Sequence, residues 1–241
     1  MPVAFWRKML FPFALVFILG LLLTSIKVNA LLLGQGWGLL ASVIIIIALV
    51  MLHWGFEQRR ISSREVAVIA MLGTIAAVGR VPFAALPNIQ PTTFMVIISG
   101  FVFGPRAGFM AGSTAALISN FFLGQGPWTP WQMLAWGLAG TSAGVMGIIL
   151  PRAGKKVMTV FSLLWGYLFG WIMNLWTWTG FIHPLTWQSF VATCAASFWF
   201  DTFHAAGNAV FYLLFGSSFV KILRRYRRKL EVTFLPAVEG K

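Results

Sequence analysis

The stretch ISGFVFGPRAGFMAGSTAALISNFF, residues 98 to 122, decides how the chain is organised. It joins two apolar runs through Gly104, Pro105 and Arg106, and Arg106 is its only charged residue. Apolar helical runs of about 20 residues cross the hydrocarbon core of a bilayer. The stretch therefore predicts two membrane-embedded helices, residues 93–103 and 107–123, joined by a short basic turn.

The composition of the whole chain indicates an all-α integral membrane protein. Of its 241 residues, 59% are hydrophobic and 10% are charged, with a mean hydropathy of +0.84. Soluble domains carry about 25% charged residues. The net charge of +13 would favour nucleic-acid binding in a soluble protein. Here the basic residues lie in short clusters between apolar runs, so membrane topology explains them and no nucleic-acid partner is expected.

Apolar runs of membrane-spanning character recur along the whole sequence. We expect eight spans, at residues 9–32, 37–56, 64–80, 93–103, 107–123, 131–150, 157–179 and 187–219. The fourth is too short to cross alone, and we interpret it as a partial span covered by its neighbours. The predicted organisation is an N-terminal transmembrane hairpin (1–60) that faces lipid or a partner, a six-helix core (61–230) and a cytoplasmic tail (231–241).

The distribution of lysine and arginine predicts the orientation of these spans. With the N-terminus in the cytoplasm, the inner segments hold 16 of the 18 basic residues, and only Lys27 and Arg80 lie toward the outer side. This agrees with the positive-inside rule. Both termini are therefore expected in the cytoplasm, and the basic cluster at residues 224–229 either anchors this topology or attracts anionic lipid.

Polar side chains recur on one face of the last apolar segment. Asp201, His204 and Asn208 are three and four residues apart, which places them on one face of a helix. Ionisable groups are costly inside a bilayer, so this stripe is expected to point into the protein. It either forms a satisfied internal network or contacts a polar ligand, and the spacing leaves both interpretations open.

The loop GRVPFAALPNIQPTTF, residues 79–94, carries prolines at three positions, which restrict its backbone. We expect an ordered outer loop that either caps the bundle or contacts a ligand. Its candidate ligand contacts are Arg80, Asn88, Gln90 and Thr92.

A second outer stretch, GQGPWTPWQM at residues 124–133, mixes indole rings with amides. Rings and amides of this kind suit a pocket for an organic molecule. The alternative is an aromatic belt at the membrane interface, and we expect Trp136 to be such an anchor. The candidate contacts here and on the facing segments are Asn120, Gln125, Trp128, Trp131, Gln132, Asn174 and Trp178.

The sequence gives no support for an enzyme. It contains no zinc-protease or phosphate-loop motif. Asp201 and His204 alone are too few to hold a metal. We therefore expect no intrinsic cofactor, and the absence of an ATPase motif means that any uphill transport draws its energy from a partner or an ion gradient.

Three segments together resemble the substrate-binding S component of energy-coupling factor (ECF) transporters, which are prokaryotic vitamin importers. These are residues 98–122, the outer GQGPWTPWQM, and FDTFHAAGNAVFYLLFG at residues 200–216. The resemblance covers residues 64–229 and implies a six-helix core, to which the N-terminal hairpin is an addition. It also implies a multi-pass protein of the prokaryotic plasma membrane that captures a vitamin at the outer face and releases it inward.

The resemblance further implies partners and a location for the binding site. The partners are a membrane coupling subunit and two cytoplasmic ATPases. In the family the first core helix docks through an Ala-x-x-x-Ala pattern, for which this chain offers Gly73 with Ala77 and Ala70 with Thr74. The family's binding regions map onto residues 80–93, 120–132 and the surroundings of Asn174, Trp178 and Asp201.

The substrate is expected to be large and mostly neutral, because the outer loops are rich in tryptophan and amides. Cobalamin (vitamin B12) is the best candidate within the resemblance, with riboflavin or another vitamin as the alternative. A different class also stays open: an autonomous ion-coupled transporter in which Asp201 and His204 form a proton relay.

Overall fold

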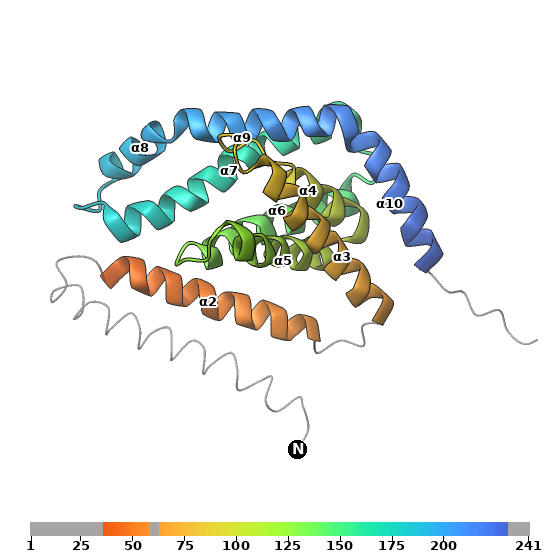
Figure 1. Cartoon of the computed structure of the whole chain (residues 1–241), viewed down its shortest axis with the longest axis horizontal. Helices are drawn as coiled ribbons and strands as arrows, with labels where there is room; N and C mark the ends of the chain where they lie inside the picture. The colour runs from red at the N-terminus through yellow and green to blue at the C-terminus, as the bar shows by residue number, and fades with distance from the viewer. Residues whose placement is uncertain (1–35, 58–62, 231–241) are drawn as a thin grey trace, which may run out of the picture.

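The computed structural model describes residues 36–57 and 63–230, and within these ranges the chain forms helices and short loops without a β-strand (Figure 1). This confirms the all-α fold class. The longer helices are α2 (Gly36–Glu57), α3 (Ser63–Arg80), α4 (Thr92–Phe103), α5 (Pro105–Leu123), α6 (Thr129–Ile149), α7 (Lys155–Phe181), α8 (Trp187–Ala196), α9 (Phe198–Phe211) and α10 (Ser217–Leu230). A 3₁₀ turn, η1 (Val81–Phe83), follows α3, and a π-helical turn, η2 (Tyr212–Gly216), joins α9 to α10.

The chain is a multi-pass membrane protein. In the described part, four helical runs are long and apolar enough to span a bilayer: Ser63–Phe83, Thr129–Ile149, Lys155–Phe181 and Phe198–Lys229. Gly38–Met51 and Thr92–Phe103 are shorter apolar helices. The predicted span at residues 9–32 and the tail at residues 231–241 lie outside the described residues, so the count of eight and the cytoplasmic termini stay predictions.

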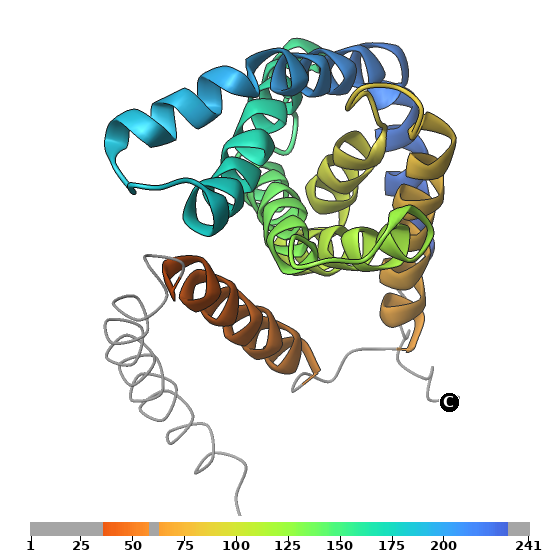
Figure 2. The same ribbon diagram turned by 60° about the vertical axis from the view of Figure 1, so that its left-hand side comes forward.

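Helix α4 lies at the centre of the bundle, with the other core helices around it (Figure 2). Every residue from Thr92 to Val102 is buried. At about 1.5 Å per residue, a helix of this length covers about 18 Å, less than the roughly 30 Å of a bilayer core. Burial by α3, α5 and α6 makes such a short helix acceptable in a membrane, so the predicted partial span is confirmed.

Helices α4, α5 and α6 approach one another through glycines. A Cβ atom on Gly108 of α5 would lie 2.3 Å from the carbonyl oxygen of Gly140 in α6, and one on Gly100 of α4 would lie 2.0 Å from the same oxygen. Gly104, with φ of 97°, turns the chain between α4 and α5 in a region that favours glycine. Residues 98–122 thus form a tight helical hairpin that packs closely against α6.

The predicted last span, residues 187–219, is wrong in its boundaries. The structure places α8 before Ser197 and a separate run from Phe198 to Lys229 after it. Neither proline nor glycine marks the break. The residue at the break is Ser197, and its hydroxyl donates to the Asp201 carboxylate at 2.8 Å. At the other end, the basic residues after Phe219 continue the helix as α10, because an amphipathic pattern sustains a helix that apolarity alone does not predict.

Helix α2 runs alongside the core and packs on α6 and α7 (Figure 1). Ile45 and Leu49 are buried against Phe109 and Trp131, whereas Ile46, Val50 and Leu39 are exposed. The Trp131 indole N–H also donates to the Ser42 hydroxyl at 3.2 Å. One face of α2 therefore contacts the core, and apolar side chains beside that face are left exposed by the described residues.

Candidate functional site

Arg80 is the centre of a polar cluster at the end of the bundle where α3 ends and α4 and α6 begin. Its Nε donates to Gln90 Oε1 at 2.7 Å, and its Nη1 donates to Ser119 Oγ and Asn120 Oδ1, both at 2.8 Å. The guanidinium carbon lies 5.1 Å from the centre of the Trp136 ring, within the range of a cation–π contact. Residues from the loop, α5 and α6 thus fix one cation in place.

Asn120 extends this cluster from α5 to α6. Its side-chain nitrogen donates to Thr129 Oγ1 at 2.9 Å and to Gln132 Oε1 at 2.8 Å. Thr129 in turn donates to Gln125 Oε1 at 2.9 Å. Asn120 is only 1% exposed, so these bonds satisfy an amide that is otherwise costly to bury. The predicted contacts from two distant outer stretches are brought together by one asparagine.

A second chain of hydrogen bonds runs from Trp136 to His204. The Trp136 indole N–H donates to Thr93 Oγ1 at 2.8 Å, and Thr93 Oγ1 lies 2.9 Å from His204 Nε2. His204 Nδ1 lies 2.9 Å from the backbone oxygen of Asn88. A carbonyl only accepts, so Nδ1 carries the proton and Nε2 accepts from Thr93. Both nitrogens of His204 are therefore used inside the protein.

Asn88 closes the loop onto α9. Its side-chain nitrogen donates to the Phe200 oxygen at 3.0 Å, and its backbone has a positive φ of 59°, which asparagine tolerates better than most residues. The predicted ordered loop is thus held by its own polar residues at one end and by Arg80 and Gln90 at the other.

Asp201 belongs to a separate small cluster rather than to the His204 chain. Asn174 donates to the Ser197 hydroxyl at 2.7 Å, and Ser197 donates to Asp201 at 2.8 Å. No hydrogen bond joins Asp201 to His204 in the part of the chain that the structure describes. The predicted inward stripe is confirmed by burial, since Asp201, His204 and Asn208 are 3%, 1% and 0% exposed.

Four further predicted contacts also lie outside the Arg80 cluster. Thr92 donates to the Ala76 oxygen and ties α4 to α3, while Trp131 turns toward α2. Trp128 packs edge-on against Trp176 at 5.9 Å between ring centres. Trp178 donates to Ser189 at 2.8 Å, which joins α7 to α8.

Trp136 corrects an expectation. It was expected to anchor the chain at the membrane interface, yet it is 1% exposed and stacks on Phe169 at 4.7 Å between ring centres. The prediction failed because tryptophan near a helix end fits both roles. The signal that could have revealed its role is Arg80, because a partly buried guanidinium that lacks a carboxylate favours an aromatic face nearby.

Ser119 was also missed as part of the site. Arg80 has five N–H donors, more than the two predicted amides can accept. Additional acceptors on the same side were therefore required, and the hydroxyl next to Asn120 is one of them.

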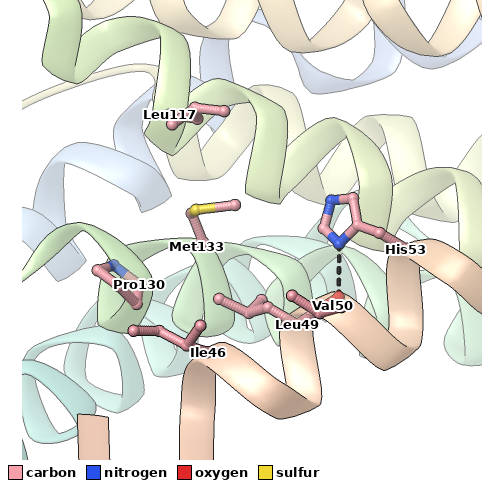
Figure 3. Close-up of a pocket in the computed structure, with 7 residues that line it drawn as sticks. All are labelled: Ile46, Leu49, Val50, His53, Leu117, Pro130 and Met133. Atoms are coloured by element: carbon pink, nitrogen blue, oxygen red, sulfur yellow. Dashed lines mark hydrogen bonds between the residues drawn. The ribbon is translucent and has the colours of Figure 1, made fainter. Parts of the chain in front are cut away.

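The chain has an apolar cleft of about 470 Å³ between α2 and the core (Figure 3). Its lining residues are Ile46, Leu49, Val50, His53, Leu117, Pro130 and Met133. His53 is its one titratable lining residue, and its ring bonds the Leu49 oxygen at 2.8 Å and Ser113 Oγ at 3.2 Å. The cleft shares no residue with the predicted contacts.

Comparison with known protein families shows to which family this chain belongs. Residues 64–224 match the model described as "ECF transporter, substrate-specific component". The chain belongs to this family. The match begins at α3 and ends within α10, so α2 lies outside the family region.

Two relatives of this substrate-specific component are bacterial proteins. A UPF0397 protein of Aliivibrio fischeri strain MJ11 is 26% identical over 123 residues, which cover 46% of this chain and 67% of that protein. A UPF0397 protein of Vibrio atlanticus strain LGP32 is 27% identical over 110 residues, which cover 42% and 60% respectively. We found no solved structure that matches the chain.

The two predicted docking pairs lie on different sides of α3. Gly73 and Ala77 are buried, and a Cβ atom on Gly73 would lie 2.9 Å from Thr114 of α5. This pair therefore packs inside the chain. Ala70 and Thr74 lie on the exposed side of α3, and the docking prediction now rests on them.

Proposed function

We propose that this substrate-specific component captures a water-soluble vitamin at the outer face of the membrane and delivers it inward. A membrane coupling subunit and two cytoplasmic ATPases would supply the energy. The observation that supports this is the Arg80 cluster, which gathers side chains from α3, α5, α6 and the loop before α4 at one end of the bundle. Residues from two of the regions that the family resemblance maps to the site, 80–93 and 120–132, lie together there.

Cobalamin is the first candidate substrate. The Arg80 cluster and the adjoining loop carry amides at Gln90, Gln125 and Gln132, and Trp128, just before α6, packs against Trp176 of α7. Ring surfaces and amides of this kind suit a large molecule with many amide groups. Riboflavin or another vitamin is the alternative within the same function.

Calorimetry on the purified chain tests the proposal. We expect saturable binding of one vitamin from a set of cobalamin, riboflavin, thiamin, biotin and folate, with a stoichiometry near one. In cells, uptake of that vitamin should require the coupling subunit and both ATPases. Uptake that persists without the ATPases and stops with an ionophore would contradict the proposal and favour the ion-coupled alternative.

A further inference from the structure

Around Arg80, the amide oxygens accept hydrogen bonds from within the protein, whereas several N–H donors have no partner there. A guanidinium has no acceptor, so the amide oxygens of Gln90 and Asn120 must face it, as they do. The Asn120 nitrogen is then turned toward Gln132 Oε1. One cation thereby fixes which way three amides point.

Three nitrogens of this cluster have no hydrogen-bond partner among the described residues: Arg80 Nη2, Gln90 Nε2 and Gln132 Nε2. In that same part of the chain, the side-chain atoms that are both fully enclosed and unpartnered belong to Asn208. The three nitrogens therefore reach accessible space. The unused bonding capacity of the cluster is donor capacity.

The positive charge of Arg80 is also unbalanced. The acidic residues in the described ranges are Glu57, Glu65 and Asp201. Glu57 ends α2 and Glu65 begins α3, at the opposite end of α3 from Arg80, and Asp201 is bonded to Ser197. A partly buried cation that meets only neutral acceptors retains a strong preference for an anion.

We propose that the donor cluster, defined as Arg80, Gln90, Asn120 and Gln132, recognises an oxyanion of the transported substrate. This inference rests on the proposed function and narrows its substrate class to a vitamin with a carboxylate or a phosphate group. Carboxylic-acid vitamins fit, and so does cobalamin through its phosphodiester. A cationic vitamin such as thiamin does not fit.

Matched pairs of compounds test the charge requirement on the purified full-length chain. The pairs are cobalamin with cobinamide, which lacks the phosphodiester, biotin with biotinamide, pantothenate with panthenol, and nicotinate with nicotinamide. We expect the anionic member of at least one pair to bind about 10 to 100 times more tightly, the range of a charge-assisted hydrogen bond.

Substitutions of Arg80 test whether this residue causes the preference for the anionic compound. Arg80→Gln should remove the difference between the two members of the pair, and Arg80→Lys should keep part of it because the charge remains. Arg152→Gln is the matched control, since Arg152 is exposed in the turn between α6 and α7 at the other end of the bundle. If neither Arg80 variant folds, the matched pairs on the unaltered chain decide alone.

The outcomes separate this inference from the proposed function. Tight binding of riboflavin or another neutral vitamin that Arg80→Gln leaves unchanged would overturn the oxyanion assignment while the importer role stands. The absence of saturable binding for every compound would remove the importer role itself.

A lipid phosphate offers the same chemistry as a substrate phosphate, so nanodiscs of phosphatidylglycerol and phosphatidylcholine are compared. Stabilisation by phosphatidylglycerol that Arg80→Gln abolishes, and with which no acidic vitamin competes, would assign the oxyanion to lipid and refute the substrate assignment.

Discussion

At the scale of single residues, Thr93 connects the tryptophan and histidine of the core. Its hydroxyl accepts from Trp136 and donates to His204, and all three side chains are almost fully buried. A buried donor or acceptor left without a partner costs about 1–3 kcal/mol. Thr93 therefore satisfies two groups that have no other hydrogen-bond partner in the described structure.

Thr93→Val is expected to lower the free energy of unfolding by about 2–5 kcal/mol, because it leaves the Trp136 N–H and His204 Nε2 unpaired at once. Thermal unfolding in detergent measures the loss. Thr159→Val is the control, since Thr159 bonds only the Lys155 oxygen one turn earlier. Equal melting temperatures for the two variants would show that the buried chain contributes nothing.

Asn120→Ala should weaken substrate binding more than any other change to an uncharged residue of the donor cluster. It removes an acceptor for Arg80 and a donor to Thr129 and Gln132, so the whole cluster loses its orientation. We expect about a tenfold to hundredfold rise in Kd for the vitamin that the unaltered chain binds. Calorimetry checks this against Thr159→Ala, whose hydroxyl bonds the Lys155 oxygen at the other end of the bundle and which is expected to change Kd less than threefold, about the effect of a few tenths of a kcal/mol.

The sequence predicted the polar members of the site well and their neighbours poorly. Arg80, Asn120 and Gln132 are conspicuous because polar groups in an apolar chain need partners. Trp136 and Ser119 are ordinary in such a chain, and only the geometry of the guanidinium reveals them. Thr92 and Trp131 were predicted contacts that the structure turns toward helix packing, because a loop's polarity does not say which way each side chain points.

At the scale of helices, the contact between α4, α5 and α6 depends on glycines, which have no Cβ atom to keep the backbones apart. Gly108→Val is expected to prevent folding or to lower the melting temperature strongly, because its Cβ would overlap the Gly140 backbone rather than a movable side chain. Fluorescence-detected size exclusion after expression measures the folded yield. Gly154→Val is the control, as no atom lies within 4 Å of a Cβ there. A normal yield for Gly108→Val would contradict the close contact.

Helix ends show where prediction from sequence stops. The hairpin around Gly104 and the short α4 were predictable, since a glycine and proline turn divides the apolar run and its length is too small for a span. The break at Ser197 was not, because it lies inside a continuous apolar run and is stabilised by a hydrogen bond to Asp201. Composition does not encode that contact.

At the scale of the whole molecule, the donor cluster lies at one end of the bundle and the basic turns lie at the other. Arg106 lies in the first turn of α5, Lys155 begins α7, and Arg224 donates to the Pro151 oxygen at 2.6 Å. This separation of charge favours the predicted orientation, with the cluster outside.

Cysteine labelling tests the orientation in a Cys194→Ser background, which removes the one native thiol. A membrane-impermeant maleimide should label Gln125→Cys in intact cells and Lys155→Cys only after the cells are opened. The reverse pattern would place the donor cluster in the cytoplasm and contradict capture at the outer face.

The place of α2 in the molecule gives another test. A chain that begins at Ser63 retains the family region but loses the cover of Phe109 and Trp131. We expect it to fold and to bind the vitamin with unchanged Kd at a lower melting temperature. Loss of all binding would make α2 part of the binding unit.

The direction of the buried chain from Trp136 to Asn88 has a consequence for energy conservation in the cell. The indole at one end only donates, and the peptide carbonyl at the other end only accepts. Protons hop along hydrogen bonds only where each member takes one up as it gives one away. Neither end of this chain allows that exchange. This line of polar groups therefore offers no proton path from one of its ends to the other.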